Sequence, residues 1–136
     1  MIFPYLTSGF EIATPAVKID LIHPETRAKE SGIARLDFGA DLTTIPFEKL
    51  DKLRLNAVGK TFTAGYNDPG EVHYLFACTL RLRSLAFHDV DVIAASTPHI
   101  LIGLDILNKL HICLDGEKKK FEIIEKRTSS RARSRR

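Results

Sequence analysis

The sequence predicts a single all-β domain with one or two short helices. Apolar and polar residues alternate in short runs, and residues that favour turns separate these runs. A hydrophobic content of 44% in 136 residues supplies one modest core. These three observations indicate one small β-rich unit rather than several domains.

The first predicted hairpin extends from residue 16 to residue 36. Alternation over residues 16–21 places three aliphatic side chains on one face of a strand, namely Val17, Ile19 and Leu21. A second strand is expected over Ile33–Leu36, and His23–Thr26 has the composition of the connecting turn.

A short helix is predicted over Pro46–Leu53. Apolar residues at 47, 50 and 53 are spaced for one helical face, and proline is well accommodated in the first turn of a helix.

The rest of the chain contains further short apolar runs bounded by turn residues. Gly65–Gly70 would join the first two of these runs as a glycine-bearing hairpin, Ser84 would separate the next two, and Asp115-Gly116 would turn the last pair. The expected strands are Thr61–Ala64, Val72–Phe76, Leu80–Leu82, Phe87–Val92, Ile112–Leu114 and Phe121–Ile124.

The charge distribution divides the chain into a domain over residues 1–125 and a basic tail over residues 126–136. The tail holds six of the 20 basic residues and no acid, which leaves 14 basic against 17 acidic residues, a net charge of −3, in the domain. Such a tail has too little apolar surface to order itself, so we expect it to be disordered.

The composition also bears on location. The N-terminus has no basic leader, and nowhere do 18 apolar residues stand together, so we expect a soluble, cytoplasmic protein with no membrane contact. Cys78 and Cys113 are expected to be reduced and buried.

Two motifs carry the main functional signal. Leu36–Pro46 places Asp37 and Gly39 between an apolar strand and a hydroxyl-rich turn, and Ile100–Leu107 follows with three aliphatic residues, a glycine and the acid Asp105. A glycine at such a place lets the chain turn sharply and present a carboxylate at the mouth of the core.

These residues resemble the retropepsin-like aspartic peptidases, the single-lobe proteases of retroviral type. Their hallmark is Asp-Thr-Gly or Asp-Ser-Gly after an apolar strand, followed downstream by aliphatic residues, a glycine and a short helix. This sequence has Asp37-Phe38-Gly39 and then Ile100–Leu110, and the similarity spans about residues 15 to 124. The resemblance implies a closed β-barrel with one lobe of the acid-protease type.

The resemblance also implies an activity. With one Asp-x-Gly per chain, two Asp37 carboxylates, one from each subunit of a homodimer, would activate a water that hydrolyses a peptide bond. Gly39 would permit the active-site turn, and Ala40 and Asp41 would bind the main chain of an extended peptide. The hairpin that contains Ala64, Gly65 and Tyr66 would close over the substrate as a lid.

The sequence departs from the family pattern at two places. Phe38 replaces a Thr or Ser whose hydroxyl bonds the opposite subunit, so this turn loses a donor. In many retroviral members an Arg after the downstream glycine pairs with the acid at position 41, but this chain has Leu104, which leaves Asp41 either another partner or solvent. Asp105 is expected to cap the helix that it begins.

Two other functions remain open. Because Phe38 lacks the hydroxyl donor, the protein could instead be a protease-fold module that dimerises or binds extended peptides without cutting them. The arginines of the tail could contact nucleic acid or another acidic partner, but only weakly and without sequence preference, since no aromatic residues are interleaved to stack on bases. The spacing of the His and Cys residues gives no metal motif, and we expect no metal or other cofactor.

Overall fold

The computed structural model describes residues 1–63 and 69–125. Its described part has two short helices and is otherwise built from strands. In chain order the elements are β1 (Ile2–Pro4), β2 (Ala16–Ile22), β3 (Lys29–Leu36), β4 (Thr44–Pro46), α1 (Phe47–Leu53), β5 (Ala57–Thr63), β6 (Glu71–Leu82), β7 (Leu85–Ala95), β8 (Ile100–Ile102), α2 (Leu104–Leu107), β9 (His111–Asp115) and β10 (Lys120–Ile124).

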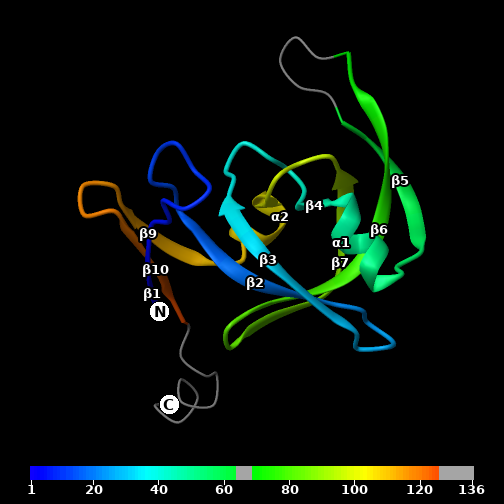
Figure 1. The fold of residues 1–136 in the computed structure, drawn as a ribbon, viewed down its shortest axis with the longest axis horizontal. Helices are drawn as coiled ribbons and strands as arrows, with labels where there is room; N and C mark the ends of the chain where they lie inside the picture. The colour runs from blue at the N-terminus through cyan, green and yellow to red at the C-terminus, as the bar shows by residue number, and fades with distance from the viewer. Residues whose placement is uncertain (64–68, 126–136) are drawn as a thin grey trace, which may run out of the picture.

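Six strands form a closed, mixed barrel (Figure 1). Their order is β2-β3-β8-β4-β7-β6, and pairing of β2 with β6 closes the ring. The β3–β8 and β4–β7 pairs are parallel, whereas the other pairs are antiparallel. Closure removes the open edges of the sheet, and β5 extends it by pairing with β6 outside the ring.

A second sheet lies beside the barrel, with the order β1-β10-β9 (Figure 1). Its inward rings join it to the barrel core: Phe3 and Phe121 stack with centroids 5.0 Å apart, and both are almost fully buried. The sheet therefore shares one hydrophobic cluster with the barrel.

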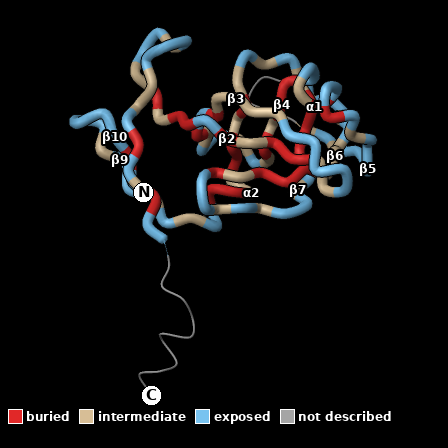
Figure 2. The backbone as a smooth tube through the Cα atoms, turned by 60° about the horizontal axis from the view of Figure 1, so that its bottom comes forward, coloured by how far each residue is buried: buried red, intermediate tan, exposed pale blue. Residues whose placement is uncertain are grey.

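The barrel core follows the predicted alternation. Val17, Ile19 and Leu21 are all buried, as expected for one face of β2, and α1 covers β3, β4 and β7 with Leu50 and Leu53 buried beneath it. Figure 2 shows the buried residues concentrated in the barrel strands, whereas the connecting loops are largely exposed.

The predicted hairpins and first helix are confirmed, with changes in extent. The second strand of the first hairpin begins at Lys29 rather than Ile33. Val72–Phe76 and Leu80–Leu82 are not separate strands, because both belong to the long strand β6, with a register shift between residues 78 and 80. The strands β1 and β4 were not predicted, since three residues are too few for an alternation to be visible.

Other expectations have mixed outcomes. The basic tail lies outside the described residues, so its state stays a prediction. Among the described residues, no helix is long and apolar enough to cross a bilayer. Both cysteines are free thiols, as expected, but only Cys78 is buried, whereas Cys113 is exposed because it lies on the outer face of β9.

The buried thiol of Cys78 should make the stability of the fold sensitive to alkaline pH. Burial raises the pKa of this thiol from its ordinary 9.0 to about 11. The unfolded chain therefore loses this proton at lower pH than the folded chain, so the stabilisation is complete below pH 9 and disappears as the pH rises to about 11. The full effect on the free energy of unfolding is at most about 3 kcal/mol.

Urea denaturation at several pH values between 8 and 11 measures this effect. Wild type and Cys113→Ser should lose stability across the interval more steeply than Cys78→Ala does. Equal slopes in all three proteins would contradict the role given to Cys78.

Candidate active site

The Asp37 turn begins where β3 ends, and the second motif holds it there. The parallel pairing of β3 with β8 sets Leu36 opposite Ile102, and the Asp37 N–H then donates to the carbonyl of Ile102 at 2.9 Å. The structure thus brings together the two motifs that the sequence singled out. The carboxylate of Asp37 is consequently held at the end of β3, directly after the buried Leu36.

The turn itself is stabilised by the side chain that it presents. Oδ1 of Asp37 accepts the N–H of Gly39 at 3.0 Å, and the N–H of Ala40 donates to the Asp37 carbonyl at 3.2 Å. The bond from Gly39 orients one carboxylate oxygen of Asp37. Because Asp37 is only partly buried, the carboxylate still reaches solvent.

Two further backbone bonds join the motifs beyond the turn. The N–H of Leu104 donates to Ala40 at 2.8 Å, and that of Asp105 donates to Asp41 at 3.1 Å. A Cβ at Gly103 would lie 2.7 Å from the carbonyl carbon of Leu42 and 2.9 Å from the oxygen of Ala40. The downstream glycine is therefore required by the close approach of the two backbones.

Asp105 is not the N-cap residue of α2, so the prediction is wrong about its position, although its Oδ1 does accept the N–H of Ile106 in the first turn of the helix at 2.9 Å. The N-cap is Gly103, without a side-chain bond. Asp105 also binds Thr43: Oδ1 accepts the Thr43 hydroxyl at 2.8 Å and Oδ2 accepts its N–H at 3.1 Å. The same hydroxyl accepts the N–H of Gly103 at 3.2 Å. We call this set of bonds the Thr43–Asp105 link.

Sequence reasoning missed Thr43 as a functional residue. It is fully buried and lies 62 positions from its partner, so no local pattern marks the pair. The hydroxyl-rich turn after the first motif was the one available signal. The link secures the segment that carries the Asp37 turn to the helix of the second motif.

Phe38 and Asp41 both point away from these internal bonds. The Phe38 ring is 48% exposed, although it stands directly beside Asp37. Asp41 is exposed, and within the described residues neither a hydrogen bond nor an ion pair engages its carboxylate. Of the two possibilities left open for Asp41, the structure favours solvent.

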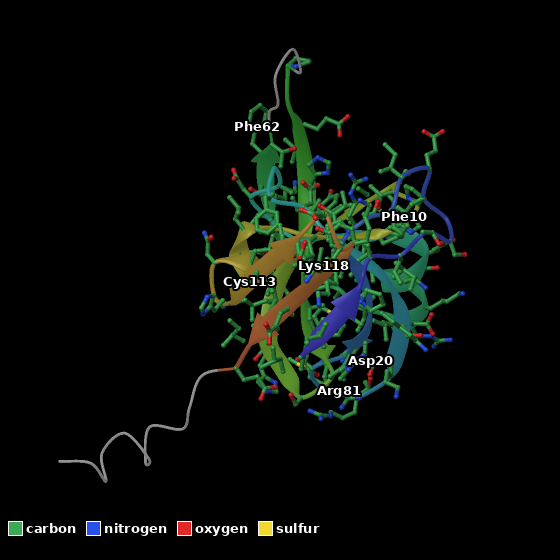
Figure 3. All side chains as sticks on the ribbon, turned by 90° about the vertical axis from the view of Figure 1, so that its left-hand side faces the viewer. Phe10, Asp20, Phe62, Arg81, Cys113 and Lys118 are labelled. Carbon is green, nitrogen blue, oxygen red and sulfur yellow. The ribbon has the colours of Figure 1, made fainter. Side chains whose placement is uncertain are left out.

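A pocket of about 520 Å³ adjoins the Asp37 turn, beneath the β5–β6 hairpin. Its lining residues are Gly39, Ala40, Asp41, Leu42, Thr44, Thr61, Phe62, Thr63, His73, Ile93 and Ala95. Residues of β5 and β6 form one wall of the pocket, and Phe62 marks this hairpin near the top of Figure 3. Ala64, Gly65 and Tyr66 lie outside the described residues, so their role remains a prediction.

A second hollow of about 520 Å³ lies between β1 and the β2–β6 region of the barrel. It contains the ion pair of Arg81 with Asp20, 2.9 Å apart, which Figure 3 places far from Phe62. We assign the candidate site to the pocket beside Asp37 because only that pocket adjoins the turn of the acidic motif. Among the described residues, His, Cys, Asp and Glu form no cluster suited to a metal.

The Thr43–Asp105 link should be a main source of stability at the site. In Asp105→Ala the buried hydroxyl and N–H of Thr43 lose their acceptor, which should reduce the free energy of unfolding by about 2–4 kcal/mol. Asp105→Asn keeps one acceptor and should cost less. Urea denaturation of both variants, with Asp51→Asn on the exposed face of α1 as control, checks this order. An Asp105→Ala protein as stable as the control would contradict it.

Comparison with known proteins supports the fold. No family model and no curated protein matches the sequence. Among solved structures, a retropepsin-like aspartic protease from Rickettsia conorii aligns with a TM-score of 0.58 and 14% identity, over 90% of this chain and 88% of that one.

Two viral proteases are also similar. The EIAV protease, solved with the inhibitor HBY-793, aligns with a TM-score of 0.54 and 19% identity, over 76% of this chain and 93% of that one. The simian foamy virus protease aligns with a TM-score of 0.50 and 14% identity, over 68% of this chain and 91% of that one. The chain therefore has the retropepsin-like fold.

Proposed function

We propose that this protein is an aspartic endopeptidase that is active as a homodimer. The observation that carries the proposal is the position of Asp37, in a hydrogen-bonded turn at the mouth of a retropepsin-like barrel and next to a pocket under a hairpin.

One carboxylate cannot supply the chemistry alone. Hydrolysis of a peptide bond needs a base that takes a proton from water and an acid that protonates the substrate. Two carboxylates about 3 Å apart share one proton and so provide both functions. The described chain presents one such group, on the turn of Asp37, and the second would come from another copy across a two-fold axis.

In the proposed cycle one Asp37 carboxylate takes a proton from a water held between the pair. The resulting nucleophile attacks the scissile carbonyl carbon, while the protonated Asp37 of the other subunit donates to the carbonyl oxygen. The proton taken from water then passes to the leaving nitrogen as the C–N bond breaks.

The substrate would bind in extended form between the barrel mouth and the β5–β6 hairpin. Ala40 and Asp41 border the pocket from below and β5 borders it from above, so a peptide could pair its backbone with either. The segment of the chain between β5 and β6, which includes Ala64, Gly65 and Tyr66, is proposed as the lid.

Asp37→Asn should abolish cleavage while the protein still folds and dimerises. The side-chain oxygen of the introduced asparagine can accept the Gly39 N–H as the Asp37 carboxylate does. The asparagine amide can neither take a proton from water nor share one with the opposite carboxylate. Mass spectrometry of peptides released from an unfolded protein substrate measures activity, and analytical ultracentrifugation measures assembly. Asp51→Asn is the control, and cleavage retained by Asp37→Asn would end the proposal.

A second candidate function follows from the exposed ring of Phe38. A phenylalanine gives no hydrogen bond to an opposing turn, so the two turns could associate without aligning their carboxylates. The protein would then be a dimerising or peptide-binding module on a protease fold. In that case wild type does not cleave, and Phe38→Thr creates activity by restoring the donor.

Under the principal proposal, Phe38 contributes to dimer formation through apolar contact. Burying two half-exposed rings across the axis contributes about 1.5–3 kcal/mol, so Phe38→Ala should raise the dimer Kd about ten- to hundredfold. Phe47→Ala is a matched control, since Phe47 is 56% exposed but lies on α1. Sedimentation at several concentrations gives both constants, and an unchanged Kd for Phe38→Ala would exclude this contact.

A further inference from the structure

The carboxylate of Asp41 is an uncompensated negative charge in the wall of the candidate substrate pocket. The ion pairs found among the described residues are those of His73 with Glu71 and of Arg81 with Asp20, and neither includes Asp41. Asp41 is exposed and lines the pocket together with Ala40, two residues from the Asp37 turn.

Position 104 lies beside Asp41 along the paired backbones and does not supply a basic partner. The backbone bonds from Leu104 to Ala40 and from Asp105 to Asp41, at 2.8 and 3.1 Å, fix residue 104 beside the Asp41 segment. A long basic side chain there could reach the carboxylate from within the same subunit. Leu104 carries no charge, so the chain leaves Asp41 available to a ligand.

The remaining pocket walls suit a side chain with an apolar stem and a polar end. Leu42, Phe62 and Ile93 supply apolar surface, and the lining also includes three threonines, namely Thr44, Thr61 and Thr63. The other titratable residue in the described lining is His73, whose Nε2 lies 3.5 Å from Glu71, so a positive charge on the ring would be balanced locally.

We propose that this pocket selects a Lys or Arg side chain of the substrate, with Asp41 as the specificity-determining residue; this inference rests on the proposed peptidase function. Both side chains lay an alkyl stem on apolar surface and keep a cationic end at a carboxylate. A volume of about 520 Å³ is within the range of pockets that accept small ligands.

The test uses extended peptides that are identical except at one position, which carries Lys, Arg, Gln, Leu or Glu. A series of such peptides places the variable residue at each position in turn, which identifies the position whose side chain enters the pocket. Wild type should cleave the Lys and Arg peptides with a kcat/KM about three- to tenfold above the Gln peptide at the selective position, and the ratio should fall at high salt.

Two variants should remove this preference by different routes. Asp41→Asn deletes the charge, and Leu104→Arg neutralises it from inside the subunit; both should bring the Lys-to-Gln ratio close to one. The matched controls are Asp51→Asn, which removes an acid outside the pocket, and Leu104→Met, which keeps position 104 uncharged. Both controls should retain the wild-type ratio, and thermal denaturation verifies that each variant is folded.

A binding measurement separates failure of this inference from failure of the proposed function. Fluorescence anisotropy with Asp37→Asn and the same labelled peptides reports selection without cleavage. Preferential binding of Lys and Arg peptides that disappears in Asp37→Asn/Asp41→Asn supports the pocket assignment even if wild type cuts nothing. Cleavage or binding with an unchanged Lys-to-Gln ratio in the Asp41→Asn background overturns the assignment and leaves the peptidase proposal intact.

Discussion

The Asp37 turn depends on hydrogen bonds from a segment more than sixty residues away. Ile102 accepts its first N–H, Gly103 approaches so closely that no side chain fits, and Asp105 binds both the N–H and the hydroxyl of Thr43. These bonds lie in a partly or fully buried region, where unpaired polar groups are costly. The geometry of the carboxylate is therefore set by the barrel and not by the loop alone.

This constraint explains why the chain can vary in the residues that face outward from the turn. Phe38 and Leu104 both depart from the pattern of the viral proteases that the chain resembles, yet neither side chain takes part in the bonds that hold the turn; Leu104 contributes only its backbone N–H. Their effects are expected at the surfaces where another molecule would bind: Phe38 where a second subunit would approach, and Leu104 beside the substrate pocket. A common fold with altered contacts is consistent with structural similarity at 14–19% identity.

The local parts of the fold could be predicted from the sequence because their signals are local. The β2–β3 hairpin, α1 and the β9–β10 hairpin follow from alternation and turn residues, and the two motifs were recognised from their order and separation. The bond between Asp105 and Thr43 could not be predicted, because an acidic residue near the start of a helix is equally consistent with capping that helix and with binding a distant hydroxyl. The strands β1 and β4 become strands only through their neighbours, and β6 runs through a register shift that interrupts its alternation.

The central claim is that two copies of Asp37 form one catalytic unit. Mixing wild type with inactive Asp37→Asn, under conditions that let subunits exchange, tests it most directly. If both carboxylates are needed, mixed dimers are inactive, and at equal amounts only about a quarter of the dimers carry the complete pair. The account predicts that activity falls with the square of the wild-type fraction, whereas a linear decrease would show that one subunit cuts alone and would contradict it.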